Sequence, residues 1–440
     1  MNKIQFSHNK KADLKYLSPS FALMVSALLF FIMLTILPVA VKIPLTSGAV
    51  FFWVICFISF LGGTILGSGN RFYMQLKTYP NNHKFVLQVI KLLVLVGIIG
   101  SILLLIDRYV LRGVSLDTDA MKSREILSQS SASMLSMISV IGYSIGIMSY
   151  MMIWVAELKQ VKVNLWIKAS AFFNVIIVIF VSVQLGSRSL LLVILISYLF
   201  AWFFTLSIKG ARVKLFHIVF TFILIILMAI ISSWLIVMRV DLMGLSMLDS
   251  ISLSGYAEII EPSEFIFDFL QRDNALTAFT AGLFSLVQYI FHGFYEFSLL
   301  FNSFSGEHEM GTRTFWLPLK VLSVISIGSI PIDVFDNSGV REGVYTTYVG
   351  PIFIDFGFLS PIVLFFNGLI IGLPFRWLML GKLAWLPAAT LVATGAILWP
   401  VVNIFESSSG AFLLFGSIVI GLLGECFGKN NVEPNRTLVS

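Results

Sequence analysis

The stretch FVSVQLGSRSLLLVILISYLFAW, residues 180–202, decides the fold class, because a single arginine, Arg188, interrupts an apolar run of roughly forty residues. An apolar segment of about 20 residues crosses a bilayer core about 30 Å thick as a helix. A membrane barrel would instead show short strands of alternating polarity. The stretch therefore predicts two transmembrane helices joined by a tight turn at residues 186–189.

The rest of the chain has the same character. It has 440 residues, of which 58% are hydrophobic and 12% charged, with a mean hydropathy of +0.94. No soluble domain buries so large an apolar share in one core. We expect an all-α polytopic membrane protein with about ten transmembrane helices, and eleven or twelve remain open. The expected spans are residues 21–41, 50–67, 85–106, 132–154, 167–185, 190–207, 214–237, 352–374, 384–403 and 411–427.

Lysine and arginine gather in the amino-terminal segment and in every second loop. Because positive residues prefer cytoplasmic loops, we expect both termini in the cytoplasm. The net charge of +6 is then a topology signal, and no nucleic-acid partner is expected. The first span has a basic leader and a long apolar run without a cleavage site, which favours a retained span over a signal peptide.

Three regions follow from this pattern. Residues 1–239 are expected to form a membrane bundle of about seven spans, and residues 351–440 a second bundle of about three. Between them, residues 240–350 form one large outer segment that is richer in Asp, Glu, Gly and Ser and contains amphipathic helices. Part of this segment, residues 275–330, is apolar enough for a surface helix or for an additional half-buried pair, which leaves twelve spans open.

Three arginines fall at outer helix ends, where the charge rule for loops does not explain them: Arg188, Arg239 and Arg341. One interpretation is a side chain that reaches lipid headgroups from an apolar stem. The other is a guanidinium that forks onto a phosphate or carboxylate. Three such arginines together favour an anionic ligand near the outer membrane surface.

Asp355 falls in the first turn of the span at 352–374, where a carboxylate is costly and indicates a functional position. The alternative is an aspartate paired with a nearby arginine for stability. The Asp-rich loop at residues 106–127 is expected to be solvated. The five histidines show no ligand spacing, so we expect no metal and no other cofactor.

Four stretches, together with the number of spans, resemble the Wzy-type O-antigen polymerases, the oligosaccharide repeat unit polymerases of bacterial inner membranes. The stretches are IDRYVLRGVSL (106–116) with Arg124 behind it, LGSRSLLLVIL (185–195), YIFHGFYEF (289–297) and REGVYTTYVGPIFIDFGFLSPIVLFFNGLIIG (341–372). Arg341 and Gly357, with fifteen residues between them, are similar to a pattern in some members.

The resemblance implies a metal-independent membrane glycosyltransferase of lipopolysaccharide biosynthesis. Its donor and acceptor are both carried on undecaprenyl diphosphate, among membrane lipids at the periplasmic face, and a chain-length regulator is a usual partner. The leaving group is the lipid diphosphate, whose growing charge a fixed guanidinium stabilises. Arg188 and Arg341, with Arg239 third, are the expected substrate-binding groups.

Such a transfer also benefits from a base that accepts the proton of the acceptor hydroxyl. The candidates are Asp355, Glu342, His292 and Glu296. Aromatic residues near the outer surface, Tyr345, Tyr348 and Trp316, are expected either to stack on sugars or to anchor the chain at the interface.

Two other functions remain open. An O-antigen ligase would use the same kind of donor on the same architecture, but the ligase-type His and Gly spacing is absent. A flippase would also need ten to twelve spans, but the two halves of the chain show no internal repeat.

Overall fold

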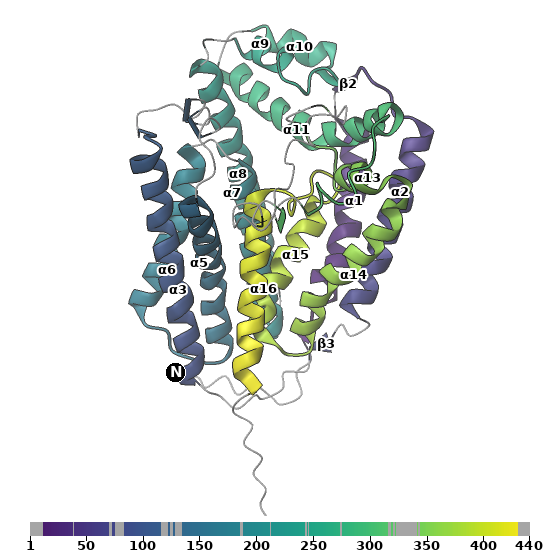
Figure 1. The fold of residues 1–440 in the computed structure, drawn as a ribbon. Coiled ribbons are helices and arrows are strands. Elements are labelled where there is room, and N and C mark those ends of the chain that lie inside the picture. Colours follow the sequence, from purple (N-terminus) through teal and green to yellow (C-terminus); the bar gives the residue numbers. More distant parts are fainter. Residues whose placement is uncertain are drawn as a thin grey trace, which may run out of the picture.

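The computed structural model describes residues 12–37, 39–69, 73–74, 83–115, 122–123, 126–127, 134–184, 188–211, 213–242, 244, 246–272, 275–315, 318–319, 322, 341 and 344–429. Long helices run side by side through most of the molecule (Figure 1). The only strands among these residues are two short antiparallel pairs, β1 (Ala12–Asp13) with β3 (Tyr73–Met74) and β2 (Val39–Val41) with β4 (Ile260–Pro262).

Helices coincide with all ten predicted spans, which confirms an all-α polytopic membrane protein. Within the described ranges, eight helices are long and apolar enough to cross a membrane, and two shorter apolar helices accompany them at Leu383–Leu398 and Ser409–Glu425. The helices are α1 (Pro19–Ile36), α2 (Ser47–Ser68), α3 (His83–Leu105), α5 (Met134–Leu158), α6 (Leu165–Gln184), α7 (Arg188–Ile208), α8 (Leu215–Leu242), α13 (Val349–Phe356) with α14 (Ser360–Met379), α15 (Leu386–Leu398) and α16 (Ser408–Lys429).

Local chemistry sets several of these helix ends. Ser18 precedes α1, and its Oγ accepts a hydrogen bond from the Phe21 backbone N–H at 3.2 Å. Pro19 then occupies the first helical position, where its missing N–H does no harm. Gly69 follows α2 with φ of 73°, a left-handed conformation that glycine adopts without strain.

Glycines bring two helix pairs into backbone contact. A Cβ on Gly63 of α2 would lie 2.0 Å from the Phe365 carbonyl oxygen of α14, and a Cβ on Gly368 of α14 would lie 2.3 Å from the Phe60 carbonyl oxygen of α2. Only residues without side chains permit this approach, which is a common basis of helix association in membranes. The same reasoning joins α3 to α5 through Gly97, Gly100, Gly142 and Gly146.

The described helices of residues 240–315 form a cap on one end of the bundle. It contains α9 (Met247–Ser252), α10 (Glu264–Leu270) and the 29-residue α11 (Ala275–Ser303), which gather at that end in Figure 1. β4 of this segment pairs with β2, so the cap is tied to the connection between α1 and α2. Helix α11 is not among the eight candidate spans, and its half from Phe291 to Ser298 is buried. Its predicted apolar partner at 314–330 lies mostly outside the described residues.

Two elements differ from the sequence expectation. The loop expected at 106–127 begins as a π-helix, Ile106–Leu111, that continues α3. Asp107 is therefore buried rather than solvated, and its Oδ2 lies 3.0 Å from Nε of Arg112. The span expected at 352–374 is broken at Gly357, whose φ of 52° ends α13 before a short 3-10 turn, Gly357–Leu359, leads into α14.

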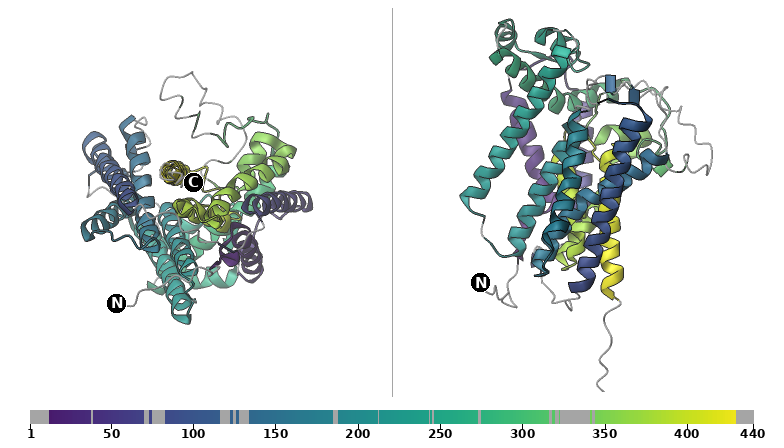
Figure 2. Two further views of the ribbon diagram at one scale, coloured as in Figure 1. Left: turned by 90° about the horizontal axis from the view of Figure 1, so that it is seen from below. Right: turned by 90° about the vertical axis from the view of Figure 1, so that its left-hand side faces the viewer.

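The first and last described parts of the chain lie at the same end of the bundle, opposite the cap. Helix α16 ends there, as the views of Figures 1 and 2 show. The β1–β3 pair lies near the same end. An even number of crossings between the two termini requires this arrangement.

Candidate functional site

A narrow cleft of about 30 Å³ lies on the cap side of the bundle. Its walls include Ser189 from the first turn of α7, Tyr289 from α11, Tyr345 from the segment before α13, and Ser407 from the turn before α16. Three of the four stretches that carry the family resemblance, 185–195, 289–297 and 341–372, therefore meet at one place.

A close backbone approach builds this meeting point. Gly293 of α11 leaves room for the 345–347 segment, since a Cβ there would lie 3.1 Å from the Val401 carbonyl oxygen and 3.2 Å from the Thr347 nitrogen. Thr347 has φ of 62°. For a β-branched residue this left-handed conformation costs on the order of 1–3 kcal/mol, and such strain is frequent at functional sites.

Arg341 is the centre of a charged network beside the cleft. Its Nη1 donates to Oε1 of Glu296 at 2.8 Å, and its Nη2 lies 3.0 Å from Oε2 of Glu258 and donates to the Gly255 carbonyl oxygen at 2.6 Å. The Arg341 side chain is 24% exposed and that of Glu296 only 2%. One face of the guanidinium is therefore held by a buried carboxylate of α11, while the group remains reachable from water.

Burial changes the acidity of Glu296. Its pKa is raised from 4.5 to about 7: loss of water raises the pKa most, Arg341 lowers it in part, and the carboxylate of Glu258 raises it. A carboxylate with this acidity exchanges protons near neutral pH. Its second oxygen, Oε2, accepts no hydrogen bond from any residue that the structure describes.

His292, one helical turn before Glu296, uses both ring nitrogens. Its Nδ1 lies 2.9 Å from the Gln288 carbonyl oxygen, so Nδ1 carries the proton, and Nε2 accepts the Tyr345 backbone N–H at 3.3 Å. Burial lowers the pKa of this fully buried ring to about 4, which keeps it neutral. In this arrangement His292 holds Tyr345 in place and has no free nitrogen to act as a base.

For the other two predicted arginines, Arg188 and Arg239, the structure gives the backbone position. Arg188 is the first residue of α7, directly before the cleft residue Ser189. Arg239 lies in the last turns of α8, just past the apolar window that ends at Met238. The predicted residues Glu342 and Trp316 lie outside the described residues.

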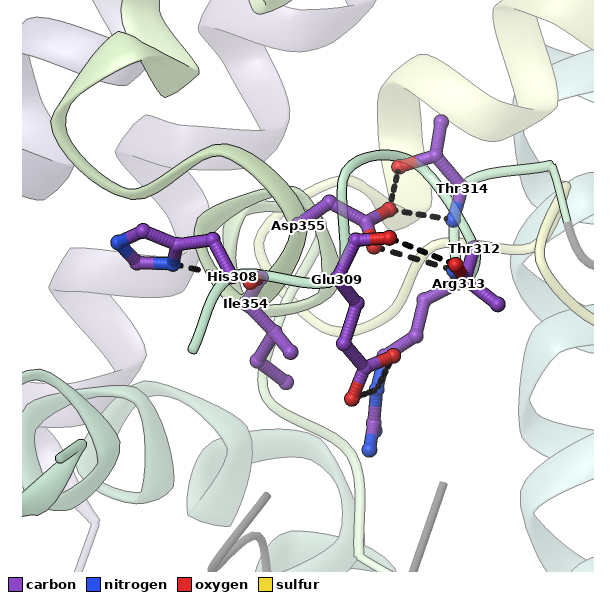
Figure 3. Close-up of polar contacts among 7 residues, drawn as sticks. All are labelled: His308, Glu309, Thr312, Arg313, Thr314, Ile354 and Asp355. Carbon is purple, nitrogen blue, oxygen red and sulfur yellow. Dashed lines mark hydrogen bonds and ion pairs between the residues drawn. The ribbon is translucent and has the colours of Figure 1, made fainter. Parts of the chain in front are cut away.

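Asp355 lies in a separate polar cluster (Figure 3). It is fully buried, and its two oxygens accept the backbone N–H groups of Arg313 at 3.1 Å and of Thr314 at 2.6 Å, together with the Thr314 hydroxyl. The guanidinium of Arg313 instead donates from Nε to Glu309 at 3.1 Å. Asp355 therefore holds the 308–314 turn through backbone amides. This is a structural role, as in the alternative of an aspartate paired with an arginine, but the guanidinium of Arg313 is not its partner.

Sequence reasoning missed several members of these networks. Tyr256 stacks on His292 with ring centroids 4.1 Å apart, and Glu258 contacts Arg341 from the same turn. Arg313 and Glu309 form their pair one turn apart near Asp355. The sequence signal for these contacts is the concentration of acidic and aromatic residues at 256–269. It predicts an amphipathic helix at the interface, because nothing in it indicates a distant partner.

No group of three or more His, Cys, Asp or Glu side chains that could hold a metal ion occurs in the part of the chain that the structure describes. Comparisons with protein-family models, with curated proteins and with solved structures find no match to this chain.

Proposed function

We propose that this multi-pass membrane protein is an O-antigen polymerase of a bacterial inner membrane. It would transfer a growing polysaccharide from undecaprenyl diphosphate to the terminal sugar of a new lipid-linked repeat unit, at the periplasmic face, with both termini in the cytoplasm. The observation that carries this proposal is the pair formed by Arg341 and the buried carboxylate of Glu296 beside the cleft.

The chemistry follows from exchanging one anion for another on Arg341. A diphosphate offers the guanidinium the same planar, two-point contact as a carboxylate does. As Arg341 turns to the diphosphate, the ionised carboxylate of Glu296 loses its hydrogen-bond donor and is free to accept a proton. The acceptor hydroxyl then attacks the anomeric carbon and gives its proton to Glu296. The bond from that carbon to the diphosphate oxygen breaks, and its electron pair leaves with the diphosphate.

One further feature supports the proposal. Helix α7 begins at Arg188, directly before Ser189 of the cleft wall, so the backbone of a second predicted arginine lies next to the cleft. Stabilisation of charge that develops on the leaving group acts mainly in the transition state, which is where it accelerates the reaction.

The test is the length of lipopolysaccharide chains in cells. Deletion of the gene is expected to leave lipid A core with a single repeat unit, and Arg341→Ala should reproduce this pattern with a loss of activity of about 10²- to 10³-fold. Arg341→Lys keeps the charge but loses the planar fork, so intermediate chain lengths are expected.

Arg272→Ala is the matched control, because Arg272 is an exposed arginine of the same cap that lies over the Phe269 ring, away from Glu296. This variant should keep full-length chains. Absence of all repeat units after deletion would indicate the ligase or the flippase instead. Normal chain lengths in a well-expressed Arg341→Ala protein would refute the proposed role of Arg341.

A further inference from the structure

The cleft and the charged network are adjacent but chemically different. Among the described residues that line the cleft none is charged: they are tyrosines, serines, a glycine and aliphatic side chains such as Leu190 and Val402. The ionic groups Arg341, Glu296 and Glu258 do not belong to its wall. A diphosphate would lose its hydration in such a cleft without gaining a counter-charge. The charged network and the cleft therefore suit different parts of the substrates: the network suits the diphosphate and the cleft suits an uncharged group.

Aromatic rings form one side of the cleft. Tyr289 and Tyr345 meet edge to face with centroids 5.6 Å apart and an interplanar angle of 81°. The ring of Tyr345 is 40% exposed, while its backbone N–H is fixed by His292. A partly exposed ring on a fixed backbone presents an apolar face of constant position.

Hydroxyl groups also line the cleft. Ser189 of α7 and Ser409 of α16 line the cleft, and neither hydroxyl bonds to a residue that the structure describes. Ser407 is different, since its Oγ donates to the Ile404 carbonyl oxygen at 2.7 Å and accepts from the Gly410 N–H at 3.2 Å. A serine hydroxyl can both donate to and accept from a ligand, so Ser189 and Ser409 offer the cleft two such groups.

We propose that this cleft binds the terminal sugar of the acceptor and that it selects an uncharged pyranose. The C–H face of a neutral sugar would lie on Tyr345, and its hydroxyls would bond to Ser189 and Ser409. The cleft is small, and we assign it to a single terminal sugar. A carboxylated sugar is excluded because its charge would be desolvated against an uncharged wall. This inference rests on the proposed polymerase function and assigns the acceptor end of that site.

The test measures sugar binding without any transfer reaction. Saturation-transfer NMR on the purified full-length protein in detergent would use methyl glycosides of glucose, galactose, mannose, rhamnose and N-acetylglucosamine, with methyl glucuronide as the charged analogue. At least one neutral glycoside is expected to receive saturation at its ring protons, and the glucuronide none. Tyr345→Ala should weaken the binding about fivefold, the effect of losing one ring contact, while Tyr345→Phe should retain it.

Tyr16→Ala is the matched control, because Tyr16 is also an exposed tyrosine but precedes α1, far from the cleft in sequence. The proposal is overturned if no neutral glycoside binds, if glucuronide binds equally well, or if Tyr345→Ala and Ser409→Ala both bind like wild type. Failure of the polymerase function would be seen separately, as normal lipopolysaccharide lengths in Arg341→Ala cells, whatever the NMR result.

Discussion

Glu296 is a carboxylate that the fold keeps out of water, and this has a cost when it ionises. Its pKa is raised from 4.5 to about 7, chiefly by burial. A group that binds its proton more tightly in the folded state contributes stability that is complete below pH 4.5 and is lost as the pH rises to about 7. The stability that the protonated side chain contributes is therefore reduced at neutral pH.

Glu296→Gln is expected to reveal this cost. Relative to the variant, the melting temperature of the wild-type protein should fall across this pH window, by an amount equivalent to about 3 kcal/mol in the free energy of unfolding. Tryptophan fluorescence melts of both proteins in detergent would measure it. Glu258→Gln serves as the control, since this carboxylate is 69% exposed and contacts the same arginine. A difference between wild type and Glu296→Gln that is constant with pH would contradict the prediction.

Asp355 gives a residue-scale prediction of another kind. Its three hydrogen-bond partners are all donors, so Asp355→Asn would turn an amide NH₂ toward at least one of them. A buried donor left unsatisfied costs about 1–3 kcal/mol, and we expect the 308–314 turn to loosen. Trypsin should then cleave faster after Arg313. The exposed aspartate of α10, Asp268, is the control, and equal cleavage rates in Asp355→Asn and wild type would show that the carboxylate does not hold this turn.

At the scale of elements, the contact of α2 with α14 depends on glycine at defined positions. Gly62 and Gly63 are neighbours, but a Cβ on Gly62 would meet only the Phe365 ring at 4.0 Å, whereas a Cβ on Gly63 would lie 2.0 Å from a backbone oxygen. Backbone atoms cannot yield as a side chain does, so one methyl group on Gly63 must push the helices apart.

Gly63→Ala is therefore expected to destabilise the protein by about 1–3 kcal/mol, while Gly62→Ala should be close to neutral. The comparison is internal, because both substitutions add the same atoms to the same helix. Equal melting temperatures for the two variants would show that α2 and α14 do not approach as described.

The elements also show what sequence can and cannot predict. Hydropathy is a property of each segment alone, so the ten apolar helices were predictable to within a few residues. Contacts between distant segments cannot be predicted from the hydropathy of each segment. The pairing of Arg341 with Glu296 and the use of both His292 nitrogens depend on how α11 lies against the 341–348 segment. The break at Gly357 was also missed, because one glycine in an apolar run does not by itself interrupt a predicted span.

At the scale of the whole molecule, the cap lies at the end of the bundle opposite to the β1–β3 pair and the end of α16. If the cap is periplasmic, a cysteine introduced at the exposed Leu253, in a background lacking Cys56 and Cys426, should react with a membrane-impermeant maleimide in cells with a permeable outer membrane. A cysteine at the exposed Lys162, between α5 and α6, should react only after the inner membrane is opened. Reaction in the reverse order would place the proposed active site in the cytoplasm and end the polymerase proposal.

The backbone contact of α2 with α14 has a mechanical consequence. Two helices whose backbones are in contact cannot slide past each other independently, so α2 and α14 are expected to move as one rigid unit. Helix α14 follows α13 after a three-residue turn, and α13 follows the segment that contains Tyr345. A displacement of that segment when a substrate binds would therefore also move α14 and α2, and so reach the opposite end of the bundle.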